Sequence, residues 1–167
     1  MDFFILRHGI AAELGAGAGA RDADRALTPK GKREMWQVAR AMKLLDLSFD
    51  LILSSPYTRA SQTAEIVAEA LGLEKTLELM DCLMPHGNAR EFISLLNKYK
   101  PAPQNVLLVG HEPYLSQLIS LLISGGSTTS VTLKKAALAK LSTDSLKFGH
   151  CATLKWLLTP KQMRLLR

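Results

Sequence analysis

The sequence predicts an α/β fold, a three-layer α/β/α sandwich in which helices cover both faces of a mostly parallel central sheet. Short apolar runs at residues 3–6, 51–53 and 106–109 lack polar alternation, which is typical of strands buried on both faces of a parallel sheet. Segments with helical spacing separate these runs. Because crossovers between parallel strands are right-handed, this alternation places helices on both sides of the sheet.

The segments between and after the apolar runs carry helix signals. Residues 58–72 have an apolar stripe and end at Gly72, a residue typical of helix C-termini. Residues 27–45 offer Thr28 as an N-cap and Pro29 at the first helical position, followed by a stripe made of Met35, Val38, Ala39, Met42 and Leu45. Further helices are expected at residues 88–99 and 113–124.

Two arrangements fit the C-terminal third of the chain. Residues 133–142 have helical propensity, whereas residues 137–142 and 152–158, on either side of "DSLKFGH", fit a hairpin, which we favour. Another strand is expected near residues 77–79. Because no fixed-period repeat or linker interrupts the sequence, residues 1–167 are expected to form one domain.

Composition narrows the classes of function. The 167 residues are 47% hydrophobic and 22% charged, which fits a globular protein with one core and excludes a disordered or fibrous chain. The net charge of +6 favours anionic partners. However, the cations are scattered and only 6% of the residues are aromatic, so a small anion fits as well as nucleic acid, which we do not expect as a partner.

Cysteine spacing and hydropathy exclude other classes. Cys82 and Cys151 lie far apart without a ligand spacing, so neither a disulfide framework nor a zinc site is expected. No apolar stretch approaches about 18 residues and no secretory leader begins the chain. We therefore expect a cytoplasmic protein that does not enter a membrane.

Basic residues follow three of the predicted strands at the point where each strand ends. The first strand is followed by Arg7, His8 and Gly9, the second by "SSPYTRA" with Arg59, and the third by "GHEP" with His111. Because ligands of open α/β sheets bind outside the carboxyl ends of the strands, these side chains are expected to converge. Two guanidinium forks beside two imidazoles suit a tetrahedral oxyanion, and phosphate is the expected ligand.

These segments carry a resemblance to a known family. "ILRHG", "ILSSPYTRASQTAE" and "LLVGHEP" resemble the three signature segments of the histidine phosphatase superfamily, in the same chain order. The short length, "LTPKG" and "PHGN" are similar to its SixA-type phosphohistidine phosphatase branch. The resemblance implies a phosphoglycerate mutase-like fold and a phosphatase that needs no metal or other cofactor.

The resemblance also implies roles for the residues at the strand ends. His8 would attack phosphorus and form a phospho-enzyme, Arg7 and Arg59 would hold the phosphoryl oxygens, Gly9 would let the backbone approach, and His111 would donate to the same group. For this chemistry His8 needs one bare ring nitrogen while the other donates to a backbone carbonyl, which we expect in its own loop. Nearby positive charge lowers the pKa of His8.

The group that protonates the leaving group is not assigned. Glu78, Asp81 and Glu91 are available, but none matches a motif. A missing acid favours phosphohistidine, because an imidazole protonated on its free nitrogen departs neutral. The resemblance to the SixA-type branch implies that the partner is a phosphohistidine-containing protein. A phosphatase or mutase for small phosphate esters, or a non-catalytic phosphate-binding module, remains an alternative.

The Gly/Ala-rich segment at residues 15–20 loosely matches a dinucleotide-binding fingerprint. It starts well past its strand and runs into "RDADRAL" instead of a helix, so the required context fails. We expect a mobile loop beside the pocket, in which Asp22, Asp24 or Arg25 touches the substrate.

Overall fold

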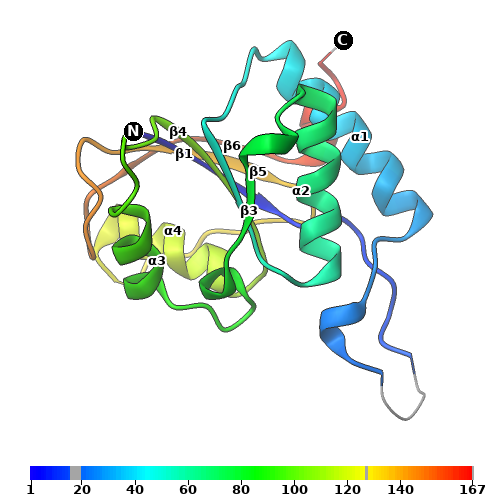
Figure 1. The fold of residues 1–167 in the computed structure, drawn as a ribbon, viewed down its shortest axis with the longest axis horizontal. Coiled ribbons are helices and arrows are strands. Elements are labelled where there is room, and N and C mark those ends of the chain that lie inside the picture. The colour runs from blue at the N-terminus through cyan, green and yellow to red at the C-terminus, as the bar shows by residue number, and fades with distance from the viewer. Residues whose placement is uncertain (16–19, 127, 167) are drawn as a thin grey trace.

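A single six-stranded sheet forms the centre of the molecule (Figure 1). The computed structural model describes residues 1–15, 20–126 and 128–166. The strands are β1 (Asp2–Arg7), β2 (Leu51–Ser54), β3 (Leu77–Leu79), β4 (Asn105–Gly110), β5 (Leu138–Ser142) and β6 (Thr153–Leu158).

The strand order is β3-β2-β4-β1-β5-β6. β1 pairs in parallel with β4, and β2 pairs in parallel with both β4 and β3. β5 runs antiparallel to β1, and β6 runs antiparallel to β5. The mostly parallel sheet predicted from the sequence is therefore confirmed, and the C-terminal third forms the hairpin instead of the alternative helix.

Helices cover both faces of the sheet, which confirms the three-layer arrangement (Figure 1). α1 (Pro29–Leu44) and α2 (Thr58–Leu71) lie on one face, and α3 (Ala89–Leu96) and α4 (Tyr114–Ser124) lie on the other. The short α5 (Pro160–Met163), which the sequence did not predict, lies next to α1, and Arg164 just beyond it forms an ion pair of 3.0 Å with Glu34. The described residues also contain the 3-10 turns η1 (Asp22–Asp24), η2 (Glu74–Thr76) and η3 (Asp81–Leu83).

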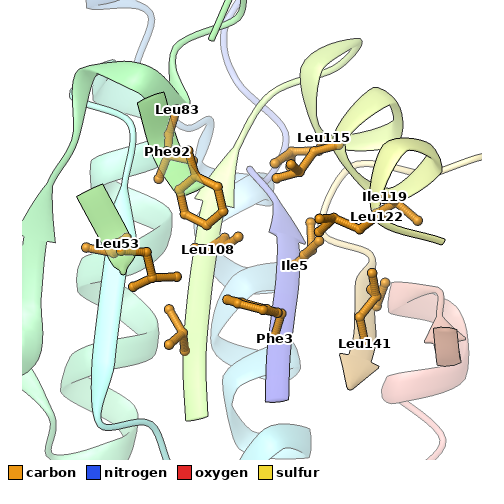
Figure 2. Close-up of a cluster of buried hydrophobic side chains, with 14 of the residues drawn as sticks. Phe3, Ile5, Leu53, Leu83, Phe92, Leu108, Leu115, Ile119, Leu122 and Leu141 are labelled. Atoms are coloured by element: carbon orange, nitrogen blue, oxygen red, sulfur yellow. The ribbon is translucent and has the colours of Figure 1, made fainter. Parts of the chain in front are cut away.

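Alternate residues of the central strands supply two hydrophobic clusters, one on each face of the sheet, instead of the one core expected from composition. Phe3 and Ile5 of β1 face α3 and α4, where they pack with Phe92 and Leu115 (Figure 2). The intervening Phe4 and Leu6 face the other layer, in which residues of α1 and α2 are buried. Because both faces of β1 are buried, its sequence shows a continuous apolar run instead of alternation.

The start of α1 is fixed against the segment that follows β1. Thr28 caps the helix by accepting a hydrogen bond of 2.9 Å from the Gly31 amide, and Pro29 occupies the first turn. A Cβ at position 31 would collide with the carbonyl oxygen of Ile10. The sequence "LTPKG" therefore brings α1 close to the backbone that carries Arg7, His8 and Gly9.

In the part of the chain that the structure describes, no helix combines the length and the apolar character needed to span a bilayer.

Candidate active site

The carboxyl ends of β1, β2 and β4 meet at one edge of the sheet. The register pairs Arg7 with Gly110 and Ser54 with Val109, so the three following loops begin at the same level. Each loop supplies a buried polar side chain: His8 is 6% exposed, His111 is 1% exposed, and Arg59, in the first turn of α2, is 5% exposed. The predicted convergence of these side chains is present in the structure.

His8 holds one ring nitrogen free of hydrogen. Its Nδ1 lies 2.7 Å from the carbonyl oxygen of Gly9, and because a carbonyl only accepts, Nδ1 carries the hydrogen. The expected hydrogen bond to a carbonyl of the same loop is therefore present. Burial, together with the charges of Arg59 and Arg7, lowers the pKa of His8 to about 4 against the opposing effect of the Gly9 hydrogen bond. Nε2 consequently presents a lone pair at neutral pH.

Arg59 joins the imidazole of His8 to an acidic turn. Its Nε donates to Nε2 of His8 at 3.3 Å, while its Nη1 and Nη2 donate to the carbonyl oxygen and the carboxylate of Asp22 at 2.6 and 2.8 Å. Asp22 also accepts from Arg25 at 2.8 Å. Burial raises the pKa of Asp22, but the hydrogen bonds from Arg25 and Arg59 outweigh this effect and lower it.

Arg7 extends from the last position of β1 into the same site. Its Nη1 donates to the carbonyl oxygen of Leu133 at 2.9 Å. Its Nε is buried and has no hydrogen-bond partner among the described residues. Burial lowers the pKa of Arg7, and the nearby Glu112 carboxylate opposes this shift. Arg7 therefore contributes a positive charge with one buried donor that no described residue satisfies.

His111 packs between His8 and Tyr57. Its ring centre lies 5.0 Å from that of His8 and 5.2 Å from that of Tyr57. Its Nε2 lies 2.9 Å from the hydroxyl of Ser55, whereas its Nδ1 is buried without a partner in the described structure. Burial, followed by the charges of His8 and Arg59, lowers the pKa of His111 to about 3, so this imidazole is neutral at neutral pH.

Thr63 connects the loop of His8 to α2. Its hydroxyl accepts from the Gly9 amide at 3.1 Å and donates to the carbonyl oxygen of Arg59 at 2.7 Å. A Cβ on Gly9 would lie 2.8 Å from the Cγ of Met35. The backbone of Gly9 is thus engaged with Thr63 and His8, and close packing explains why glycine stands at this position.

The sequence did not predict that the Thr63 hydroxyl positions the loop of His8 by joining Gly9 to Arg59. The signal was present, because Thr63 is a fully buried hydroxyl four residues after Arg59 on the apolar side of a helix. A hydroxyl at such a position needs a partner.

The remaining acidic candidates lie in three places. Asp22 reaches Arg59, whereas Asp24 pairs with the exposed Arg21. Glu78 accepts from the Tyr99 hydroxyl at 2.7 Å and lines a separate hollow with Lys100 and Pro101. Asp81 and Glu91 line a hollow of about 310 Å³ that Tyr57 also lines.

The nucleotide-binding alternative for residues 15–20 falls largely on residues 16–19, outside the described chain.

Comparison with known proteins places this geometry in a family. The pattern of the histidine phosphatase superfamily (branch 1) matches residues 3–84. The chain is 31% identical to the phosphohistidine phosphatase SixA of Escherichia coli (strain K12), covering 99% of this chain and 98% of that protein. It is 32% identical to the SixA homolog of Haemophilus influenzae, covering 88% and 91%.

A solved structure agrees with the sequence comparisons. The protein histidine phosphatase SixA complexed with tungstate superposes with a TM-score of 0.82 at 30% identity, over 96% of this chain and 98% of that one. The chain belongs to the histidine phosphatase superfamily.

Proposed function

We propose that this protein is a phosphatase that forms a covalent phosphohistidine on His8, and that its substrate is phosphohistidine on another protein. One observation carries the proposal: the bare Nε2 of His8 lies beside Arg59, and the buried Nε of Arg7 and Nδ1 of His111 lack partners in the described structure. Buried donors around a lone pair suit an oxyanion whose central atom the lone pair attacks.

The reaction proceeds in two displacements. The lone pair of His8 Nε2 is first released from its hydrogen bond with Arg59 Nε. It then forms a bond to phosphorus as the bond from phosphorus to the leaving group breaks, and that electron pair stays on the leaving group. A water then bonds to the same phosphorus and passes a proton to the solvent, and the electron pair of the broken N–P bond returns to Nε2. Inorganic phosphate leaves and His8 is restored.

The surrounding residues act on the charge of the phosphoryl group. Arg7 and Arg59 hold its oxygens, and Arg59 exchanges its bonds to Asp22 for bonds to the substrate. His111 donates a hydrogen bond to an oxygen whose charge changes in the transition state. The hydrogen bond from Nδ1 to the Gly9 carbonyl keeps the ring of His8 in the orientation that presents Nε2.

The lack of a carboxylic acid at the nucleophile favours a nitrogen leaving group. Across residues 1–15, 20–126 and 128–166, no carboxylate is hydrogen-bonded to His8 or His111. An alkoxide needs a proton as it leaves, whereas the imidazole of phosphohistidine departs neutral once its other nitrogen is protonated. The names of the full-length SixA relatives support the same substrate class.

The experiment compares two substrates and two proteins. Wild type and His8→Ala are incubated with a phosphohistidine-bearing phosphotransfer domain and with an aryl phosphate. We expect wild type to dephosphorylate the protein at a kcat/KM at least tenfold above that for the aryl ester, and His8→Ala to be inactive on both. Faster turnover of the ester would favour a small-molecule phosphatase. Phosphate binding without turnover of either substrate would favour a non-catalytic module.

A further inference from the structure

Ser55 touches His111 from the side away from its unpartnered nitrogen. Ser55 follows the last residue of β2 and is fully buried, and its hydroxyl oxygen lies 2.9 Å from Nε2 of His111. The same oxygen accepts a hydrogen bond of 3.3 Å from the Tyr57 amide. The structure places it in contact with a ring that faces the nucleophile.

The number of buried polar groups left without a partner decides the direction of the hydrogen bond between Ser55 and His111. If Nε2 carried the hydrogen and donated to Ser55, two buried groups would lack partners, the lone pair of Nδ1 and the hydroxyl hydrogen of Ser55. If Ser55 donates to Nε2, its hydrogen is used and Nδ1–H alone lacks a protein partner. Each buried unpaired polar group costs free energy, so the second arrangement, which leaves one such group instead of two, is favoured.

The Tyr57 amide further favours a hydrogen bond in which the Ser55 hydroxyl donates to Nε2 of His111. A serine hydroxyl donates one hydrogen and accepts through two lone pairs. Since the Tyr57 N–H already points at the Ser55 oxygen, the hydroxyl hydrogen turns away from that amide. Within the described residues, His111 Nε2 is the acceptor that hydrogen reaches.

We infer that Ser55 is a positioning residue that holds neutral His111 in the tautomer with hydrogen on Nδ1. The inference rests on the proposed function, in which His111 donates to the phosphoryl group. A neutral imidazole has a single N–H, so this tautomer determines whether His111 meets a phosphoryl oxygen with a donor or with a lone pair. Tyr57, packed edge-to-face on the ring at 66°, limits a flip that would exchange the nitrogens.

Ser54 provides a matched control. It is also a fully buried serine at the end of β2, but its hydroxyl donates to the backbone carbonyl of Ser55 at 3.0 Å and makes no hydrogen bond to His111. Ser54→Ala and Ser55→Ala each remove one buried hydroxyl of the same strand end. A loss that reflects packing alone would affect both variants.

The test reads the tautomer directly. ¹⁵N-labelled wild type, Ser55→Ala and Ser54→Ala are studied by long-range ¹H–¹⁵N correlation at neutral pH, with the His111 signals assigned from His111→Gln. We expect hydrogen on Nδ1 in wild type and Ser54→Ala, and a mixture of tautomers or hydrogen on Nε2 in Ser55→Ala. We also expect kcat to fall by about 10- to 100-fold in Ser55→Ala with little change in KM.

Two results would overturn the inference. One is wild-type His111 with its hydrogen on Nε2, and the other is Ser55→Ala with the wild-type tautomer and the kcat of Ser54→Ala. The spectra do not depend on turnover. If wild type shows the expected tautomer but hydrolyses no phosphorylated substrate, the proposed function fails while the assignment of Ser55 to the tautomer stands.

Discussion

The Nε of Arg59 lies 3.3 Å from Nε2 of His8 while both terminal nitrogens of Arg59 are bonded to Asp22. One guanidinium therefore contacts His8, the proposed nucleophile, and a carboxylate at the same time. The Asp22 carboxylate occupies donors that hold a phosphoryl oxygen in the proposed mechanism. Binding of the substrate and the ion pair with Asp22 are expected to compete.

Replacing Asp22 by asparagine tests this competition. The asparagine side chain keeps an oxygen that accepts from Arg59 but removes the negative charge, and the ion pair is half-exposed on the carboxylate side, so its contribution is about 1 kcal/mol. We expect inorganic phosphate and tungstate to inhibit Asp22→Asn with inhibition constants about three- to tenfold lower than for wild type.

The neighbouring Asp24 is the control for Asp22. It belongs to the same turn but pairs with the exposed Arg21, so Asp24→Asn is expected to leave the inhibition constants within twofold of wild type. Weaker inhibition of Asp22→Asn than of wild type would contradict competition and indicate that Asp22 instead holds Arg59 in its binding position.

The low pKa values of two histidines predict how stability depends on pH. Folded His8 and His111 have pKa values of about 4 and 3, against 6.5 for an ordinary histidine. Between these values the unfolded chain binds more protons than the folded one, so the free energy of unfolding decreases as pH falls from about 6.5 towards 4. Their contribution is fully present above pH 6.5 and is lost progressively below it.

Denaturant unfolding at pH 7.5, 6.5, 5.5 and 4.5 measures this effect. We expect the decrease per pH unit to be smaller in His111→Gln, which lacks one of the two groups, by up to about 1.4 kcal/mol. Replacement of the exposed His150 by glutamine serves as the comparison and is expected to retain the wild-type dependence. Equal stability of wild type at pH 7.5 and 5.5 would show that the pKa values of His8 and His111 are not lowered in the folded protein.

Gly31→Ala tests the contact between α1 and the loop after β1. The added Cβ would collide with the carbonyl oxygen of Ile10, so helix and loop must separate. We expect a loss of about 1–3 kcal/mol in the free energy of unfolding and a lower kcat/KM, because the displaced segment carries His8. Gly126→Ala, where a Cβ meets nothing within 4 Å, should change neither quantity. Full activity in Gly31→Ala would show that the loop holds His8 without α1.

Thr63→Val tests the link between Gly9 and Arg59. Valine has nearly the same shape as threonine but leaves the Gly9 amide and the Arg59 carbonyl without the hydroxyl they share. We expect a loss of about 1–3 kcal/mol in stability and a reduced kcat, measured by denaturant unfolding and steady-state kinetics. Thr63→Ser keeps the hydroxyl and is expected to retain most of the activity. Equal kcat in the two variants would contradict the link.

The fold and the convergence of the site followed from local signals. The buried runs of β1, β2 and β4 set a parallel sheet, and a parallel sheet brings Arg7, His8 and His111 to one edge by topology alone. The hairpin of β5 and β6 was favoured over a helix because two short segments lie on either side of "DSLKFGH". The strands and the hairpin depend on residue patterns within one segment, and the position of the site depends on the topology of parallel sheets.

What the sequence did not reveal depends on contacts between distant segments. Thr63 lies 54 residues from Gly9, and Asp22 lies 37 residues from Arg59. The helical pattern places Thr63 on the apolar side of α2 but does not show that its partner is Gly9. The pattern around Asp22 does not distinguish its carboxylate from one exposed to solvent. The short α5 was missed for a related reason, because its four residues give too few positions to show a helical period.

If His8 is the nucleophile, its Nε2 becomes phosphorylated during turnover. Wild type is mixed with a ³²P-phosphohistidine protein, quenched at alkaline pH within milliseconds, and mapped by peptide mass spectrometry. We predict acid-labile label on His8, absent from His8→Ala. Label on a serine or cysteine, or rapid turnover by His8→Ala, would contradict the account.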